Sequence, residues 1–222
     1  MKEPIKLIGN VASPYTRKMV AYLRYKRIPY EVIWSQPEDV LKKMNIEPPK
    51  PILLPIFILD RDGQASAVTD STPLIREFEE YYPDRSVLPK DPALNFINFI
   101  LEDFGDEWCT KFMFHYRWHF NEDADNAGTI LPLGINSALT DDELAFFKEH
   151  FAKRQIDRLW VVGSNNDTAE FIDKSYKNVL SIFEEHFKRQ PFLLGNYPSS
   201  CDFAVYGQFT QLVGFDPTPR KI

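Results

Sequence analysis

The first part of the chain alternates short apolar runs with one amphipathic segment. The apolar run within Lys6 to Asn10 is typical of a strand. The next segment places apolar side chains at i, i+4, i+7 and i+8, the spacing of one helix face. These side chains are Tyr15, Met19, Tyr22 and Leu23. The other face carries Arg17, Lys18, Arg24 and Lys26. The run "RIPYEVIW" then predicts a second strand, parallel to the first under the right-handed crossover rule.

Two further strands and a helix follow a polar, proline-rich connection. The stretch "ILLPIFILDRDGQASAVTD" contains two apolar runs separated by Asp-Arg-Asp-Gly, whose Asp-Gly is a strong hairpin signal. The stretch "STPLIREFEEYY" predicts a helix with its apolar side chains on one face. They are Leu74, Ile75, Phe78 and Tyr82. The order βαβ then ββα predicts an α/β thioredoxin-like domain over residues 1–85.

The pattern changes after the proline-rich stretch "PDRSVLPKDP", and we expect residues 86–92 to form a linker. Beyond it, strand-type alternation gives way to the helical period. A long apolar stripe contains Ile97, Leu101, Phe104, Trp108 and Phe112. The stretches "TDDELAFFKEHFAKRQIDRL" and "TAEFIDKSYKNVLSIFEEHF" are amphipathic, and the first opens with a capping sequence. We therefore predict an all-α domain over residues 93–222.

Composition narrows the class of protein. The chain of 222 residues is 44% hydrophobic and 14% aromatic, which is enough for a core. A net charge of -6 argues against nucleic acid or an anionic membrane as the partner. No apolar window suits a signal peptide or a membrane span. Cys109 and Cys201 form no pair motif, so we expect a reducing, cytoplasmic location.

Three positions carry candidate chemistry. Pro55 interrupts an otherwise good strand, and a cis Leu54–Pro55 bond resolves that conflict; an edge-strand proline is the alternative. Asp70 and Ser71 precede a helix, either as a plain N-cap or as a site where helix N–H groups and the hydroxyl take a carboxylate while Asp70 takes an ammonium. Ser13 is either an N-cap or a hydrogen-bond donor to an anion.

Together these motifs resemble a known superfamily. The stretch "SPYTRKMVAYLRYKRIPYEVI", the Leu-Pro of "ILLPIFIL" and the stretch "TDSTPLI", in this order, resemble the amino-terminal half of the glutathione transferases. The stretch "PFLLGNYPSSCDFAVYGQF" resembles their helical half, with Ser199 and Asp202 as a capping box. The resemblance implies glutathione transferase architecture, glutathione as co-substrate, a small hydrophobic electrophile as partner, and a homodimer.

The same resemblance implies roles for individual residues. Ser13 contacts the glutathione sulfur, so the reactive thiol arrives with glutathione. Asp70 and Ser71 hold the γ-glutamyl end, and the Leu54 backbone ahead of cis-Pro55 pairs with the cysteinyl amide.

Departures from the family pattern open alternatives at two positions. Leu53 stands where relatives have a lysine, so recognition of the glycine carboxylate falls to Lys50 or another cation. Thr16, one turn from Ser13, is an alternative sulfur ligand.

Aromatic and histidine residues cluster in "FMFHYRWHF". His115 and His119 have the spacing of metal ligands, but no third ligand is spaced with them, so we interpret the pair as structural and expect no metal. In the resembling family this helix borders the electrophile pocket. Tyr116 and Trp118 are therefore wall candidates, together with Tyr15.

The predicted activity is attack of the glutathione thiolate on a hydrophobic electrophile. A non-catalytic glutathione-transferase-like scaffold is the first alternative, which the missing lysine favours. A glutathione-dependent isomerase or peroxidase is the second. The ending "GFDPTPRKI" follows soon after the capping-box helix, where relatives continue with more helix, so truncation at the carboxyl end is one interpretation.

Overall fold

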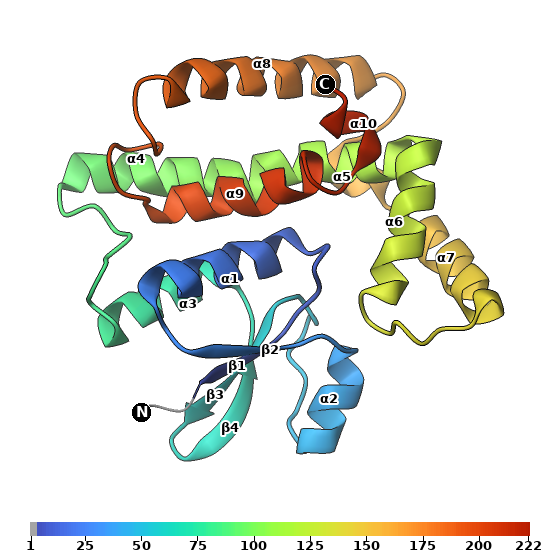
Figure 1. Cartoon of the computed structure of the whole chain (residues 1–222), viewed down its shortest axis with the longest axis horizontal. Coiled ribbons are helices and arrows are strands. Elements are labelled where there is room, and N and C mark those ends of the chain that lie inside the picture. The colour runs from blue at the N-terminus through green and yellow to red at the C-terminus, as the bar shows by residue number, and fades with distance from the viewer. Residues whose placement is uncertain (1–3) are drawn as a thin grey trace.

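A four-stranded mixed sheet forms the base of the amino-terminal part (Figure 1). The computed structural model describes residues 4–222. The strands are β1 (Ile5–Ile8), β2 (Tyr30–Ile33), β3 (Ile56–Arg61) and β4 (Gln64–Val68), in the order β2-β1-β3-β4. β1 is parallel to β2 and antiparallel to β3, and β3 is antiparallel to β4. Asp62 and Gly63 turn between β3 and β4 with φ of 57° and 80°, the positive values that a tight hairpin turn needs.

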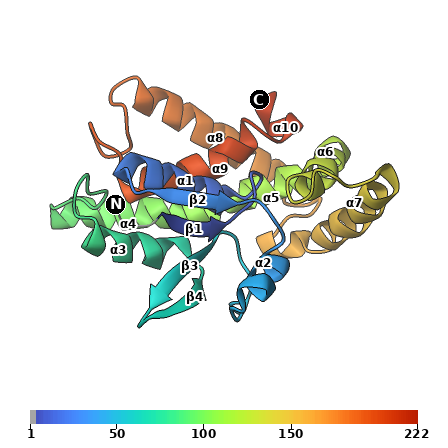
Figure 2. The ribbon, with the colours of Figure 1, turned by 60° about the horizontal axis from the view of Figure 1, so that its bottom comes forward.

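Helices cover both faces of the sheet because successive residues of a strand point to opposite sides. On one side, Leu7 packs with α1 (Pro14–Lys26) and α3 (Ser71–Tyr81). On the other side, Ile8 packs with Leu41 of α2 (Pro37–Met44). Figure 2 shows α2 on the side of the sheet away from α9. The thioredoxin-like prediction is confirmed, although the sequence analysis did not predict α2.

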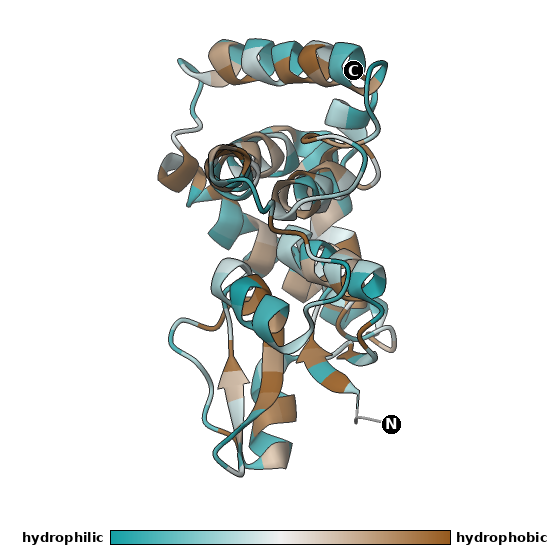
Figure 3. Cartoon of the chain, turned by 90° about the vertical axis from the view of Figure 1, so that its left-hand side faces the viewer, coloured by the Kyte–Doolittle hydropathy of each residue, from teal (hydrophilic) through white to brown (hydrophobic). Residues whose placement is uncertain are grey.

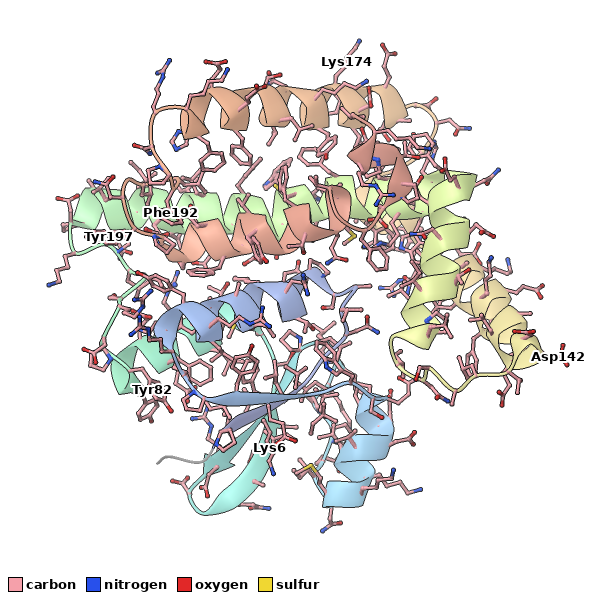
Figure 4. The ribbon with its side chains drawn as sticks, in the orientation of Figure 1. Lys6, Tyr82, Asp142, Lys174, Phe192 and Tyr197 are labelled. Carbon is pink, nitrogen blue, oxygen red and sulfur yellow. The ribbon has the colours of Figure 1, made fainter. Side chains whose placement is uncertain are left out.

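The rest of the described chain is helical, as predicted (Figure 1). A long first helix consists of α4 (Pro92–Asp103), the π-helical turn η1 (Phe104–Trp108) and α5 (Cys109–His119). It is followed by α6 (Asn121–Leu133), α7 (Asp141–Ile156), the short 3₁₀ turn η2 (Leu159–Val162), α8 (Ala169–Phe187), α9 (Ser200–Leu212) and α10 (Pro217–Arg220). Hydrophilic and hydrophobic residues alternate along α8, as Figure 3 shows. In Figure 4, Asp142 lies at the outer end of α7 and Lys174 points away from α8.

Helix α9 lies at the centre and packs closely against α1 and η1. A Cβ at Gly207 would approach the Pro14 carbonyl oxygen to 2.5 Å, and one at Gly105 would approach the Val205 nitrogen to 2.8 Å. Only glycine allows backbones to come this near. Asp202 accepts the N–H groups of Ser199 and Leu193, both at 2.8 Å, which secures the start of α9.

On two helices the buried and exposed faces differ from those predicted from the sequence. Lys18 and Lys26, expected on the polar face of the first helix, are 0% and 6% exposed. Lys18 is enclosed by groups of α3, α4 and η1, and Lys26 pairs with Glu79 of α3 at 2.7 Å. The apolar stripe is exposed at Ile97 and Trp108, while the polar Asn98 and Glu102 point inward. Helix α6 was not predicted at all.

Within residues 4–222, no helix is both long enough and apolar enough to cross a membrane.

Candidate functional site

The sheet register brings the three predicted regions to one edge. Ile8, at the end of β1, pairs with Ile56, at the start of β3, so the loop leading to Ser13 and the Leu54–Pro55 segment emerge at the same place. Val68, the last residue of β4, pairs with Phe57, which brings the start of α3 alongside. Thr69 donates to the carbonyl oxygen of Leu53 at 3.0 Å and joins two of the loops directly.

Ser13 is the N-cap of α1 and is partly exposed. Its Oγ accepts the backbone N–H of Thr16 at 3.2 Å, and Pro14 occupies the first helical turn. A hydroxyl has one hydrogen to donate, and an internal N–H already occupies the Ser13 oxygen. The hydroxyl hydrogen is thus left for an acceptor at the positive end of the helix.

Leu54 supplies backbone groups that the fold does not use. The Leu54–Pro55 peptide bond is cis, as is Lys50–Pro51. Within residues 4–222, neither the N–H nor the C=O of Leu54 makes a backbone hydrogen bond. Backbone groups that lie just before a strand and have no partner in the fold are suited to pairing with a peptide ligand.

Asp70 and Ser71 begin α3 in a way that a plain cap does not require. Asp70 has φ 81° and ψ 111°, in the left-handed region that favours glycine, whereas an N-cap normally has extended backbone. Its side chain accepts the N–H of Thr72 at 3.3 Å. Strained residues of this kind cluster at functional sites, which favours a binding role for Asp70 over capping alone.

A buried lysine, which the sequence analysis missed, supports Ser71. Lys18 Nζ donates to Ser71 Oγ at 3.0 Å and to Thr72 Oγ1 at 3.3 Å. It also pairs with Glu102 at 3.1 Å and Asp106 at 2.6 Å. Ser71 Oγ therefore acts as an acceptor on the inside, and its hydrogen is free to donate outward. The available signal was spacing, since Lys18 lies four residues before Tyr22, which the sequence analysis placed on the buried face.

The carboxylates around Lys18 respond to burial and charge together. Burial favours the neutral form of Glu102, but Lys18 and Arg76 lower its pKa below the usual value overall. Arg76 pairs with Glu102 at 2.5 Å. Burial raises the pKa of Asp106, although Lys18 opposes that shift. The Asp106 Oδ1 atom is buried and has no hydrogen-bond partner.

Three further candidates, the alternative sulfur ligand Thr16, the pocket-wall candidate Tyr15 and the cation Lys50, occupy different environments. Thr16 is 0% exposed and its Oγ1 accepts the Asn10 N–H at 3.4 Å, so it lies inside the fold and away from the ligand side. The Tyr15 hydroxyl donates to the Asp106 carbonyl oxygen at 2.7 Å, which directs the side chain to η1. Burial raises the pKa of Tyr15 to about 12, so its hydroxyl stays protonated. Lys50 is exposed and lies 3.9 Å from Glu47, with no buried contact.

The structure does not bring Tyr116 and Trp118 to this edge, which corrects their prediction as pocket walls. Tyr116 is 0% exposed and donates to Asp173 of α8 at 2.8 Å. Trp118 packs against Phe151 of α7 and the alanines of α6. Both side chains fill gaps between helices of the helical part, because α5 is covered on those sides by α6, α7 and α8.

His115, His119 and the two cysteines pack within the helical part of the chain. His115 and His119 stack with ring centroids 4.6 Å apart, and the His115 Nδ1 lies 2.7 Å from Ser164 Oγ. Within residues 4–222, no three acidic, histidine or cysteine side chains gather as a metal site. Cys109 and Cys201 are free and buried, and burial raises the pKa of both thiols, that of Cys109 to about 12.

A cavity of about 630 Å³ lies between the two parts of the chain but away from Ser13. Its lining includes Ala21 and Tyr25 of α1, Phe183 of α8 and Phe209 of α9. Eight helical residues separate Ser13 from Ala21, a rise of about 12 Å. The cavity is therefore not the place where an electrophile would meet a sulfur held by Ser13.

Comparison with known sequences identifies the class of protein. Residues 7–86 match the sequence model of the family described as Glutathione S-transferase, N-terminal domain. The amino-terminal part belongs to this family, and the chain has the fold of the glutathione transferase superfamily, which confirms the resemblance. The comparisons do not assign a transferase class. No curated protein matches the sequence.

Solved structures extend the similarity over nearly the whole chain. The beta-etherase LigF from a Sphingobium species aligns with a TM-score of 0.61 and 20% identity, covering 95% of this chain and 84% of LigF. FzlA from C. crescentus gives 0.58 and 16%, covering 97% and 81%. A glutathione S-transferase from Methylobacterium radiotolerans, solved with glutathione sulfonate, gives 0.55 and 17%, covering 96% and 81%. Identities of this size establish a shared fold.

Proposed function

We propose that the protein is a glutathione transferase that binds glutathione at the edge formed by Ser13, Leu54 and Ser71. The observation that carries the proposal is the convergence, through the β1–β3 and β3–β4 registers, of two outward hydroxyl donors with free Leu54 backbone groups. A tripeptide with an anionic sulfur at one point and an α-amino acid head at another matches these groups. The similar transferase solved with glutathione sulfonate supports such a ligand.

The proposed reaction is attack of the glutathione sulfur on an electrophilic carbon, with loss of the leaving group as an anion. Ser13 donates to the sulfur and stabilises the thiolate, assisted by the positive end of α1. Lowering a thiol pKa by about two units corresponds to roughly 2.7 kcal/mol of preferential thiolate stabilisation. The protein's own cysteines do not serve this step, because burial keeps both protonated.

The rest of glutathione fits the other groups. Ser71 and the first N–H groups of α3 receive the α-carboxylate of the γ-glutamyl end, and Asp70 receives its ammonium. Leu54 pairs with the cysteinyl amide. Lys50 lies in the loop ahead of Leu54 and is the candidate for the glycine carboxylate.

A hydrophobic electrophile suits the surface around the loops. Val11, Trp34 and Leu53 are 38%, 44% and 53% exposed. Trp34 follows Ile33, whose carbonyl oxygen accepts the N–H of Gly9 at 3.2 Å, so Trp34 lies beside the loop that leads to Ser13. Free, reduced cysteines support a cytoplasmic location for this chemistry.

The test uses a matched series at position 13. Ser13→Ala removes the hydroxyl and the cap, whereas Ser13→Gly removes the hydroxyl and weakens the cap by only a few tenths of a kcal/mol. Both variants are expected to turn over chlorodinitrobenzene with glutathione at about a hundredth of the normal kcat or less, and Ser13→Thr is expected to keep activity. Thr140→Ala, which removes the N-cap of α7, controls for loss of a cap alone.

Calorimetry with glutathione separates the proposal from the scaffold alternative. Binding by the unmodified protein supports a glutathione site, and absence of binding at millimolar glutathione would favour the scaffold. Normal kcat in Ser13→Gly would show that Ser13 does not contact the sulfur.

We also propose a homodimer that uses the exposed side of α4. Phe96, Phe99 and Ile100 follow the i, i+3, i+4 spacing and are 64%, 57% and 47% exposed. Exposed apolar rows of this kind mark interfaces. In analytical ultracentrifugation Ile100→Glu is expected to shift the protein to monomer, whereas Phe171→Glu on α8 leaves the dimer intact. A monomeric unmodified protein would contradict the proposal.

A further inference from the structure

The peptide unit that precedes Ser13 is held from both sides. The Ala12 carbonyl oxygen accepts Arg117 Nη1 at 2.9 Å, and the Ser13 N–H donates to the Asn10 carbonyl oxygen at 3.0 Å. A peptide unit is planar, so fixing its C=O and its N–H fixes the plane from which the Ser13 side chain extends. The bond to the C=O comes from α5, in the helical part of the chain.

Arg117 has its donors directed by other buried groups. Its Nε lies 2.9 and 3.1 Å from the two carboxylate oxygens of Asp216, and its Nη2 donates to Gln211 Oε1 at 2.9 Å. Arg117 is 3% exposed and Asp216 0%. A guanidinium is a rigid planar fork, so fixing two of its nitrogens also fixes the third. The Phe215 ring lies 4.8 Å from the guanidinium carbon and closes its face.

Gln211 binds the carbonyl group one residue earlier in the loop, that of Val11. Its Nε2 lies 3.4 Å from the Val11 carbonyl oxygen, so Gln211 reaches both the loop and Arg117. The two carbonyls ahead of Ser13 are therefore bound by α5 and α9.

The segment after α9 holds Asp216 in place. Asn126 of α6 donates to the Phe215 carbonyl oxygen at 3.1 Å, and the Thr218 N–H donates to Asp123 at 2.8 Å. The Asp216 N–H donates to the Gln211 carbonyl oxygen at 2.9 Å. The stretch "GFDPTPRKI", to which the sequence analysis gave no role, thus places the carboxylate that orients Arg117.

We propose that Arg117, oriented by Asp216 and Gln211, is a positioning residue that sets the direction of the Ser13 hydroxyl. This inference rests on the proposed function for its catalytic consequence. Arg117 acts through the Ala12 carbonyl and touches neither glutathione nor the electrophile. The orientation of the group that binds the sulfur therefore depends on the helical part of the chain. The contacts of Leu54, Asp70 and Ser71 with the rest of glutathione do not depend on Arg117.

The principal variant is Arg117→Lys, which keeps the charge but cannot reach Asp216, Gln211 and Ala12 together. We expect the pKa of the bound glutathione thiol, followed by the ultraviolet absorbance of the thiolate against pH, to rise by about one unit. We expect kcat to fall about tenfold, with KM for glutathione within twofold of normal. Gln211→Met is the second variant, in case Arg117→Lys does not fold. It removes the Gln211 bonds to Arg117 Nη2 and to the Val11 carbonyl oxygen, leaves the Arg117–Asp216 pair intact and should raise the thiol pKa in the same direction by a smaller amount.

The control is Thr218→Val, which removes only the hydroxyl bond from Thr218 to Asp123. The backbone N–H bond from residue 218 to Asp123, which holds the segment, and the contacts of Arg117 stay in place. It is expected to lower stability without changing the thiol pKa. An independent readout is amide hydrogen exchange of residues 10–16 in the ligand-free protein, which should speed up in Arg117→Lys and stay normal in Thr218→Val.

The outcomes separate the two proposals. If the unmodified protein binds no glutathione, the proposed function fails, and hydrogen exchange alone decides whether Arg117 orders the loop. If glutathione binds but the thiol pKa and the exchange of residues 10–16 are the same in Arg117→Lys as in the unmodified protein, the positioning role is wrong and the Arg117–Asp216 pair is structural only.

Discussion

At the scale of single residues, the backbone of Asp70 is the clearest sign of a binding role. A φ of 81° is unfavourable for any side chain with a Cβ, and residues held there typically store 1–3 kcal/mol. Arg27, at the end of α1, has φ 58° but occupies a C-cap position where this conformation is common. Capping alone would be served as well at an extended backbone, so the strain at Asp70 supports the ligand-binding role that we propose for it.

We expect Asp70→Gly to raise the unfolding free energy by about 1 kcal/mol, because glycine adopts positive φ freely. The same variant should lose at least tenfold in glutathione affinity, since the carboxylate that receives the ammonium is gone. Arg27→Gly, measured by the same urea titration and calorimetry, should gain similar stability and keep its affinity. Normal affinity in Asp70→Gly would show that Asp70 is only a cap.

Protonation of His115 is expected to make the folded protein less stable as the pH falls. Burial, with a smaller contribution from the neighbouring His119, lowers the pKa of His115 to about 4 from an ordinary value of 6.5, while Asp173 opposes the shift. The unfolded chain takes up this proton as the pH falls below 6.5, but the folded protein does not until about pH 4. Stability is thus lost between pH 6.5 and about 4, by at most about 1.4 kcal/mol per pH unit.

The check compares unfolding curves of the unmodified protein and His115→Asn, in which the amide replaces Nδ1 opposite Ser164. At pH 7.5 the variant should be less stable. The difference in unfolding free energy between the two proteins should become smaller as the pH falls to 5, because the variant has no imidazole at this position to protonate in the unfolded state. Parallel stability profiles across this range would contradict the assignment.

At the scale of elements, α1 is the helix on which the site depends. It is covered by the sheet on one side and by α9 on the other, and the contact with α9 is close because Gly207 has no Cβ to strike Pro14. Pro14 follows Ser13 directly, so the position of α9 also determines where the candidate sulfur ligand lies.

Gly207→Ala is expected to lower the unfolding free energy by about 1–3 kcal/mol, even though alanine is the better helix former, because the new methyl group meets a backbone carbonyl. Gly128→Ala makes the same change in α6, where the added carbon meets mainly the side chain of Lys148. Urea unfolding of this control should show no loss or a small gain. Equal losses in both variants would mean that the α1–α9 contact is not unusually tight.

At the scale of the whole molecule, a buried group of charges joins the sheet part to the helical part. Lys18 of α1 and Arg76 of α3 face Glu102 of α4 and Asp106 of η1, two positive against two negative side chains. Lys18 also reaches Ser71, so the same cation ties the two parts together and fixes a site residue. A buried pair of this kind stabilises little in net terms, but breaking it is costly because one charge is left alone.

We therefore expect Lys18→Met to destabilise the protein by about 3–5 kcal/mol in urea unfolding at neutral pH. Asp106 is the carboxylate left without a cation in this variant, since Glu102 keeps Arg76 and Ser200 as partners. Adding Asp106→Asn to Lys18→Met should recover part of the loss, because the unpaired carboxylate is removed. If the double variant is no more stable than Lys18→Met alone, the two charges do not interact as the structure indicates.

How much the sequence revealed differs between parts of the molecule. Strand alternation, the Asp62–Gly63 turn and the helical period fixed the order of elements, because these signals act between residues close in the chain. Ser13, Leu54 and Ser71 stood out for the same local reason, as residues at the ends of strands and starts of helices. The sequence analysis did not predict helix α2 or the burial of Lys18, since neither follows from the spacing of apolar residues along the chain.

By itself the sequence determined the two-part architecture and the short motifs that the site is built from. Only the tertiary structure decided that Lys18 stands beneath Ser71, that Tyr116 and Trp118 fill helix contacts, and that Arg117 reaches the loop before Ser13 from more than a hundred residues away. The physical reason is that burial and pairing of a side chain depend on which elements cover it. That covering is set by packing between segments far apart in the chain, on which local patterns carry no information.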